Sequence, residues 1–442
     1  MKNLLKSVVF LVLLFLAVFA VQRHFKVGTR LCFQSEAGFY EEKQGALDGV
    51  YIGASNVYAF WQPPVAWKNH GIAVLTYSVD ALPSSALKAM MIEARKTQPD
   101  ALYIINLNTF KKTAATSEEM HRVTNYLNPS FNKYSLIWQL ADIGNIPPAD
   151  RLEYYFPIIR FHSRWSELTR NDFLLQTNGR KMGYGSSDYY KKSVNLSKNY
   201  LMTESLPEKE PEATEVLLDL LDYIEKNSVK ALFVIVPQAL KEEYATELNS
   251  LKKTVSEHGY PCLDLLNHYE DPGILTKTDF FDKNHTNVHG SMKFTEYLSQ
   301  YLIEHYRFED KSRQEGWDEW NSAAEKYTAL ISPYALPFEI EGKPRKCTMN
   351  ASGLSVTKTE KQSASVKWKA AKGADGYQIY QKTGSEAWTY LDSVDADTTE
   401  YETEVLEQAG QYAYTVVPVL SKKGTIYYGS YTYNGKSITV SK

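Results

Sequence analysis

Short apolar runs alternate with helical patterns between residues 45 and 305, and this alternation constrains the fold more than any other feature. The runs lie at 49–52, 73–75, 101–105, 231–236 and 262–265. Apolar residues at helical spacing mark segments 84–96, 213–226, 241–257 and 290–306, the last of which we expect to end the domain's helices. Short buried strands separated by helices indicate a parallel sheet with helices on both faces. The sequence therefore predicts a three-layer α/β domain.

One long segment, about 109–211, interrupts this alternation. It is rich in Tyr, Asn, Gly and Ser, as in the glycine- and serine-rich run 183–187. We expect an insertion of irregular helices and loops lying over the sheet. Long connections on such scaffolds are often functional lids, but a plain surface excursion fits the same composition.

The last segment, 345–442, has strand-like alternation between turn signals such as 372–373 and 409–410. This spacing predicts a β-sandwich. Trp368, then Gly376-Tyr377-x-Ile379-Tyr380, then Tyr412-x-Tyr414-x-Val416 resembles bacterial fibronectin type III domains. We expect the aromatic residues to lie mainly in the core and in cross-strand pairs, and the domain to be a spacer or protein-binding module.

The N-terminus carries a targeting pattern over residues 1–30. Lys2 and Lys6 precede an apolar run at 8–21, as in a secretory signal or signal anchor. The run is short for a spanning helix unless Lys6 snorkels to the interface. We favour an uncleaved anchor with the N-terminus inside; a weak cleavage site at Val18 and Ala20 leaves secretion open. In both cases the rest of the chain lies outside the cytoplasm.

Composition narrows the class of protein. The chain is 43% hydrophobic and 23% charged, which excludes a disordered or multi-pass membrane protein. A net charge of −3 shows no excess of positive charge of the kind that nucleic-acid-binding proteins carry. Three cysteines cannot build a disulfide scaffold, and sparse cysteine in an exported chain fits a bacterial cell envelope.

Residues suited to nucleophilic chemistry lie at both ends of the α/β region. Ser55 follows the first buried strand, where open α/β sheets place ligands. Asp282 and His285 are three apart, so Asp282 can orient the imidazole and leave its other nitrogen to take a proton from a serine. Plainer interpretations are a helix-capping serine and an exposed turn. A metal site at Asp282, His285 and His289 is disfavoured, because the Glu of zincin motifs is missing.

Together, Gly53-Ala54-Ser55 and the later Asp282-x-x-His285-x-Asn287-x-x-Gly290 resemble the SGNH/GDSL hydrolase superfamily. The resemblance implies a flavodoxin-like three-layer domain over 31–332 with a Ser55, His285 and Asp282 triad. A reaction at such a triad needs no cofactor. It also implies an oxyanion hole made by the Ser55 N–H and by Asn108, which follows the strand after Gln98-Pro99-Asp100. The superfamily's usual second-block glycine is missing near 77–79.

The altered first block resembles membrane-anchored proteins of envelope modification, such as the D-alanyl-lipoteichoic acid biosynthesis and alginate O-acetylation proteins. This implies an esterase or O-acyltransferase acting on cell-surface polysaccharides beside a membrane-bound O-acyltransferase. We assign substrate-binding roles to Asn56, Arg160, Arg164 and Trp165, the last three of which also fit a solvated helix face. The alternative is a catalytically inactive scaffold or glycan-binding surface protein.

Overall fold

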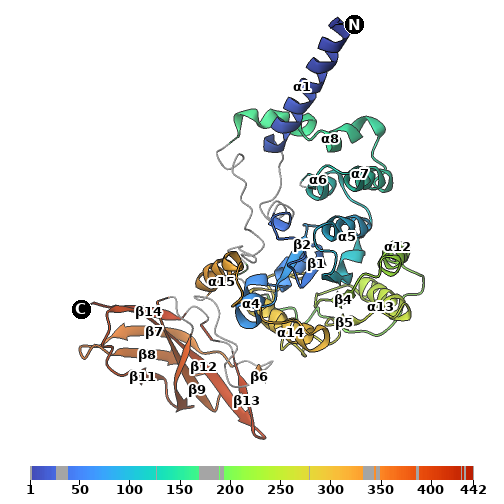
Figure 1. The fold of residues 1–442 in the computed structure, drawn as a ribbon. Coiled ribbons are helices and arrows are strands. Elements are labelled where there is room, and N and C mark those ends of the chain that lie inside the picture. Colours follow the sequence, from blue (N-terminus) through green and yellow to red (C-terminus); the bar gives the residue numbers. More distant parts are fainter. Residues whose placement is uncertain are drawn as a thin grey trace.

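The structure is a computed structural model. It describes residues 2–25, 38–125, 127–168, 189, 194–277, 279–331, 343–344, 349–384, 388–429, 431–432 and 435–441. A parallel five-stranded sheet forms its centre (Figure 1). In spatial order the strands are β2 (Val74–Ser78), β1 (Gly49–Gly53), β3 (Leu102–Asn106), β4 (Ala231–Ile235) and β5 (Cys262–Asp264). The predicted parallel sheet is confirmed.

Strand order reverses between β1 and β3, since β2 lies on one side of β1 and the later strands on the other. In doubly wound sheets the carboxyl ends of the two strands at such a reversal border the crevice where ligands bind. Ser55 follows β1, and Asn108 follows β3 in the short helix η2 (Leu107–Lys111). The topology therefore brings these two sequence segments to one edge of the sheet.

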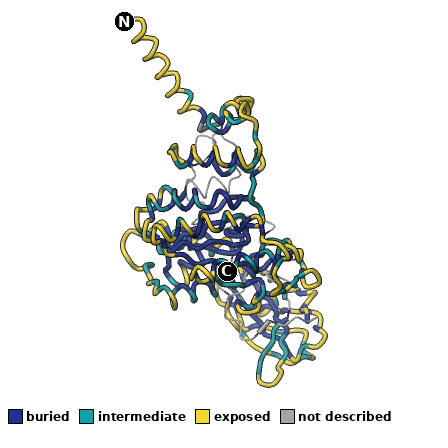
Figure 2. Tube along the Cα trace, turned by 90° about the vertical axis from the view of Figure 1, so that its right-hand side faces the viewer, coloured by how far each residue is buried: buried dark blue, intermediate teal, exposed yellow. Residues whose placement is uncertain are grey.

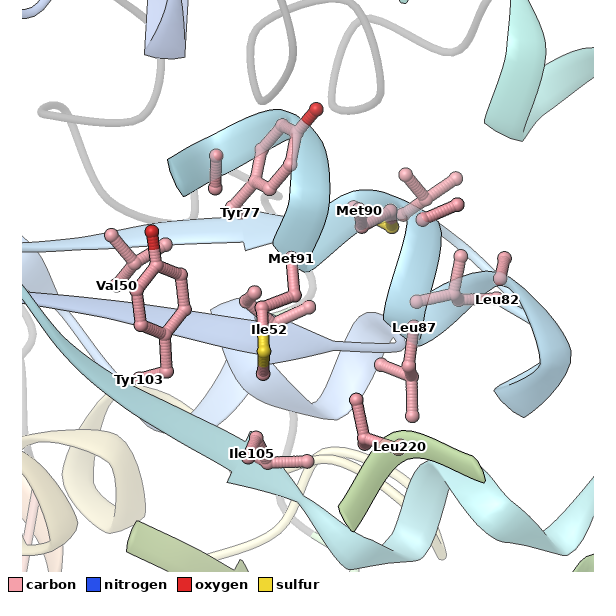
Figure 3. Close-up of a cluster of buried hydrophobic side chains, with 14 of the residues drawn as sticks. Val50, Ile52, Tyr77, Leu82, Leu87, Met90, Met91, Tyr103, Ile105 and Leu220 are labelled. Carbon is pink, nitrogen blue, oxygen red and sulfur yellow. The ribbon is translucent and has the colours of Figure 1, made fainter. Parts of the chain in front are cut away.

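Helices cover both faces because alternate strand side chains point to opposite sides. Val50 and Ile52 of β1 pack with α5 (Leu87–Arg95), α12 (Ala213–Lys226) and α13 (Glu242–Glu257). Figure 3 shows part of this core, including Met90 and Leu220. Tyr51 packs on the other face with α3 (Ser55–Phe60) and α14 (Val288–Tyr306).

One helix was not anticipated. α15 (Asp318–Ile331) follows α14 and packs on α4 (Pro63–His70). The Trp67 ring lies 5.2 Å from that of Trp320, and its Nε1 donates to Asn321 Oδ1 over 2.8 Å. The expectation that helix 290–306 is the last one is therefore wrong, because an aromatic cluster from distant segments holds a further helix.

The segment expected as an insertion contains several helices. They are α6 (Ser117–Thr124), α7 (Phe131–Ile143), η3 (Pro148–Arg151), α8 (Leu152–Tyr155), α9 (Ile158–Phe161) and η4 (His162–Ser166); the short helix η1 (Ser84–Ala86) precedes α5, before the segment begins. They stack outward from α5 toward the N-terminal helix α1 (Lys2–Phe25) (Figure 1). The run 183–187 lies outside the described residues.

The described strands of the C-terminal region pair antiparallel, as expected for a sandwich, apart from the two-residue strand at 343–344, which pairs in parallel. One sheet pairs β7 (Ser352–Lys358), β8 (Ala364–Lys369) and β11 (Glu400–Glu402). The other holds β6 (Lys343–Pro344), β9 (Gly376–Thr383), β10 (Thr389–Asp395), β12 (Gly410–Lys422), β13 (Thr425–Tyr428) and β14 (Lys436–Val440). Trp368 meets Tyr377 edge-on at 5.3 Å between them, so the aromatic motif residues lie in the core.

Candidate functional site

Ser55 occupies the first position of α3, immediately after β1. Gly53 closes the strand, and a Cβ there would lie 2.8 Å from Thr109 Oγ1 and 2.8 Å from the Val57 side chain. Only glycine therefore lets the β1–α3 turn approach the end of β3. Ala54 donates its N–H to Thr109 Oγ1 over 3.1 Å, which fixes the turn that presents Ser55.

Ser55, His285 and Asp282 form a hydrogen-bonded chain. Ser55 Oγ lies 2.8 Å from His285 Nε2. His285 Nδ1 lies 2.9 and 3.0 Å from the two carboxylate oxygens of Asp282. With its proton on Nδ1, the imidazole donates to Asp282 and accepts from the serine hydroxyl. This is the arrangement that activates a serine nucleophile.

Electrostatics favour an ionised Asp282. Burial alone would raise its pKa, but bonds from the His285 ring and from the N–H groups of Asn284 and His285 outweigh burial, and the net pKa is lowered. Those N–H groups donate to Oδ1 over 2.7 and 3.0 Å. A fixed carboxylate can therefore stabilise the imidazolium that forms when His285 takes a proton.

The loop that carries Asp282 and His285 is tied to the sheet domain from two directions. Thr286 Oγ1 donates to the carbonyl of Ala59 in α3 over 2.7 Å. On the β4 side, Gln238 Nε2 donates to Asn284 O over 3.0 Å, and Ala239 N donates to Lys283 O over 2.9 Å. The bond to Ala59 links the histidine loop directly to the serine helix.

The end of the loop explains Asn287 and Gly290 of the sequence motif. Asn287 caps α14, its Oδ1 accepting from the N–H groups of His289 and Gly290. A Cβ at Gly290 would lie 2.4 Å from the carbonyl oxygen of Asp279. The helix can start this close to the loop only because residue 290 has no side chain. Asp279 also pairs with Lys293 over 2.7 Å.

Two aromatic contacts at the site were missed by sequence reasoning. The Phe281 ring stacks on that of His285, with centroids 5.3 Å apart and planes inclined by 12°. Tyr58, one helical turn after Ser55, donates its hydroxyl to Asp80 in the loop after β2. An aromatic residue four positions before a candidate histidine is too common a pattern to have identified Phe281.

The side-chain amide of Asn108, expected as an oxyanion donor, is hydrogen-bonded within the protein. Asn108 Nδ2 donates over 3.1 Å to both Val236 O and Gln238 Oε1, and its Oδ1 accepts from Val236 N over 2.8 Å. Its amide is therefore engaged in joining β3 to the end of β4 instead of being free for a substrate oxygen. Asn56, beside Ser55, is buried, and its Oδ1 has no hydrogen-bond partner within the described chain.

Two of the three insertion residues assigned to substrate binding have other partners, and the third is largely exposed. Arg160 pairs with Glu153 over 3.2 Å. Arg164 donates to the carbonyl of Phe25 at the end of α1 over 2.9 Å. Trp165 is 73% exposed. The structure thus places them beside α1 and does not join them to the triad.

In the described part of the chain, no group of three or more His, Cys, Asp or Glu residues is arranged to hold a metal ion. His289, the third member of the disfavoured metal set, is a helix residue with a buried Nε2. Burial lowers its pKa to about 4.

Comparisons with known proteins reach only part of the chain. No family model matches it, and no curated protein matches its sequence. Solved fibronectin type III structures match the C-terminal region. A domain of human collagen XX is 16% identical, covering 24% of this chain and 99% of its own, with a TM-score of 0.18. A Clostridium thermocellum Fn3-like protein is 24% identical, covering 18% and 84%, with a TM-score of 0.16.

A third similarity extends further along the chain. The Clostridium perfringens spore cortex lytic enzyme SleM is 10% identical, covering 51% of this chain and 84% of its own, with a TM-score of 0.17. At such scores none of these similarities carries an argument about activity. The C-terminal region is similar to fibronectin type III domains, and the SGNH/GDSL resemblance stays a prediction.

Proposed function

We propose that the protein is an exported, membrane-anchored serine esterase or O-acyltransferase of the SGNH type that acts on acyl esters of cell-surface glycans. The observation that carries the proposal is the chain from Ser55 through His285 to Asp282, with the serine oxygen 2.8 Å from the imidazole. The position of Ser55 at the reversal of strand order adds support, since ligands bind at such points.

The mechanism follows from these contacts. His285 Nε2 takes the hydroxyl proton as Ser55 Oγ attacks the ester carbonyl, and the N–H of Ser55 faces the developing oxyanion. The imidazolium returns its proton to the leaving alcohol, and the acyl group remains on Ser55. Water or a glycan hydroxyl then attacks the acyl-enzyme, with His285 again as base. Water makes the protein an esterase, and a glycan hydroxyl makes it a transferase.

A basic cluster beside the site favours an anionic glycan. Lys111, Lys241 and Lys283 follow β3, β4 and Asp282, and their mutual proximity adds to burial in lowering the pKa of Lys111. Among the described residues none of the three has a carboxylate partner. Lys111 lies 4.5 Å over the Tyr244 ring in a small pocket that Asn108 and Gln238 also line. Phosphate or carboxylate groups of a substrate would neutralise this cluster.

The inactive-scaffold alternative has one specific observation in its favour. The Asn108 amide is engaged with Val236 and Gln238, so one of the two expected oxyanion donors is missing. Removing one such donor from a serine hydrolase typically costs about 100- to 1,000-fold in rate. Labelling by a phosphonylating reagent reports whether Ser55 is activated, and ester turnover reports whether the site completes the reaction, so the two measurements together separate the hypotheses.

The experiment uses the full chain in detergent, as wild type, Ser55→Ala and the control Ser312→Ala, which changes a partly exposed serine outside the triad. Each is treated with a fluorophosphonate probe, and then with p-nitrophenyl acetate with and without anionic cell-wall oligosaccharides. We expect labelling of wild type and Ser312→Ala only. Ser55-dependent hydrolysis identifies an esterase, and acyl transfer to the sugar identifies a transferase. A folded wild type that neither labels nor turns over would contradict the proposal and favour the scaffold.

A further inference from the structure

The N-terminal helix α1 has the features of a membrane anchor. Its segment Asn3–Gln22 is long and apolar enough to span a membrane, and its large apolar side chains are mostly exposed, although Gln22 at its end is buried. Figure 2 shows its exposed surface projecting from the folded domains. Apolar side chains on an isolated helix require either lipid or another protein to cover them.

The segment 152–166, which comprises α8, α9 and η4, packs against this helix (Figure 1). Phe156 meets Phe15 edge-on, with ring centroids 6.2 Å apart. Arg164 donates to the carbonyl of Phe25, where a cation also complements the negative end of the helix dipole. These two contacts are ten residues apart along α1, so the segment follows about 15 Å of its C-terminal half.

Large apolar side chains on the same segment lack cover from the described chain. Leu152, Ile159 and Trp165 are 54%, 49% and 73% exposed. Arg160, beside Ile159, keeps 39% of its side chain exposed while paired with Glu153. Tryptophan and arginine next to aliphatic residues are the composition of segments that lie at a membrane surface.

We propose that segment 152–166 is a membrane-interface element that packs on a retained α1 and inserts Ile159 and Trp165 into the outer leaflet of a lipid bilayer. The occupant of this face is lipid, because the face is continuous with the apolar surface of α1. The element fixes how the α/β domain sits over the membrane and keeps its sheet edge near membrane-linked substrates. It does not depend on the proposed chemistry of Ser55.

Depth along α1 agrees with an interfacial position. Phe15 lies seven residues inside the Gln22 end of the apolar segment, which is about 10 Å. Its contact with Phe156 places the element about that far into the apolar layer, and interfacial helices bury their apolar face by about 5–10 Å.

The backbone of the element is also suited to this depth, since unpaired peptide groups are costly in lipid. Phe156 N donates to Leu152 O over 2.9 Å, and Phe161 N donates to Pro157 O over 3.0 Å. Pro157 has no N–H to satisfy. These consecutive single turns therefore give backbone N–H and C=O groups hydrogen-bond partners within the element, whereas an irregular loop would leave such groups unpaired.

The test places a nitroxide on the full chain in lipid nanodiscs that contain phosphatidylglycerol. Cys32, Cys262 and Cys347 are replaced by Ser, and single cysteines are introduced as Ile159→Cys and Trp165→Cys. The control is Val405→Cys, on an equally exposed side chain (58%) of the C-terminal domain. Collision of the label with oxygen, which concentrates in lipid, is compared with collision with a nickel chelate, which stays in water.

We expect the oxygen-to-nickel ratio to be higher at residues 159 and 165 than at 405, and to fall at 159 when Arg164→Gln weakens the contact with α1. Equal ratios at the three positions would overturn the proposal. Labels shielded from both reagents would mean that a protein covers the face, which also overturns it. A mature N-terminus after α1, found by intact mass, would remove the helix on which the element packs and would likewise overturn it.

Discussion

Ser55 Oγ lies 2.8 Å from His285 Nε2 although 230 residues separate them in the chain. The parallel sheet accounts for the approach, because all strands deliver their carboxyl ends to one edge. The final register comes from the Thr286 hydroxyl, which bonds to Ala59 four residues after the serine. The candidate nucleophile and base are therefore held by the connection between α3 and the loop before α14.

Replacing Asp282 by asparagine tests the orientation of His285. An amide can hold the ring in the wrong tautomer and cannot stabilise the imidazolium; in serine proteases the equivalent change costs about 10⁴-fold in kcat. We expect fluorophosphonate labelling of Ser55 in Asp282→Asn to slow by about 1,000-fold or more. Asp142→Asn, which breaks the exposed pair with Arg151, is the control and should label at the wild-type rate. A normal rate in Asp282→Asn would remove the aspartate from the mechanism.

Thr286→Val tests the link between the serine helix and the histidine loop. The change keeps the shape and leaves the Ala59 carbonyl without its donor, which costs about 1–3 kcal/mol of stability. We expect slower labelling of Ser55 as well as a lower unfolding midpoint in urea. Thr254→Val removes a comparable hydroxyl-to-carbonyl bond within α13 and should lower stability alone. Equal labelling rates in the two variants would show that the link does not position the site.

The sheet and the triad residues could be predicted because their signals are local. Each strand is short, apolar and bounded, and Asp282 and His285 are three apart in one turn. Ser55 follows a strand whose end must lie at the ligand-binding edge. The catalytic roles stay predictions, but the three side chains meet as the pattern required.

Features that depend on distant partners could not be predicted. Asn108 was expected to donate a hydrogen bond to the substrate, but its side-chain amide is hydrogen-bonded to the backbone of Val236, 128 residues away. Arg164 was assigned to a substrate but caps α1, because nothing in the sequence indicates which helix a loop cation reaches. α15 is held by Trp67, some 250 residues earlier in the chain. Tertiary packing determines each of these outcomes.

Acid should destabilise the fold through His289. Burial, opposed by Asp279 and reinforced by Lys293, lowers its pKa from 6.5 to about 4. Between these values the unfolded chain binds a proton that the folded chain does not, so stability is full above about pH 6.5 and falls as pH drops toward 4. The loss is about 3 kcal/mol. Urea unfolding at pH 7 and pH 4.5 should show a smaller difference for His289→Gln than for wild type. Equal differences would mean that His289 takes up a proton equally in the folded and unfolded chain, so that folding does not lower its pKa.

The lysine cluster predicts that substrate charge matters at this site. A substrate anion would interact with Lys111 and Lys283 across a partly solvated edge, and one exposed charge contact contributes about 0.2–1 kcal/mol, or up to about 5-fold in KM. We expect Lys111→Gln and Lys283→Gln each to raise KM by about 2- to 5-fold for a phosphate-bearing acyl ester and to leave KM unchanged for p-nitrophenyl acetate.

Salt provides the second measurement, and Lys226→Gln on α12, which loses only an exposed pair with Asp222, provides the control. Exposed charges are screened beyond about 10 Å at 0.1 M salt, so raising salt should increase the wild-type KM for the anionic ester toward that of the variants. The Lys226→Gln enzyme should follow wild type throughout. A KM for the anionic ester that responds to neither salt nor the two lysine changes would leave the cluster without a role in binding, and a neutral acyl glycan would then be the better candidate for the substrate.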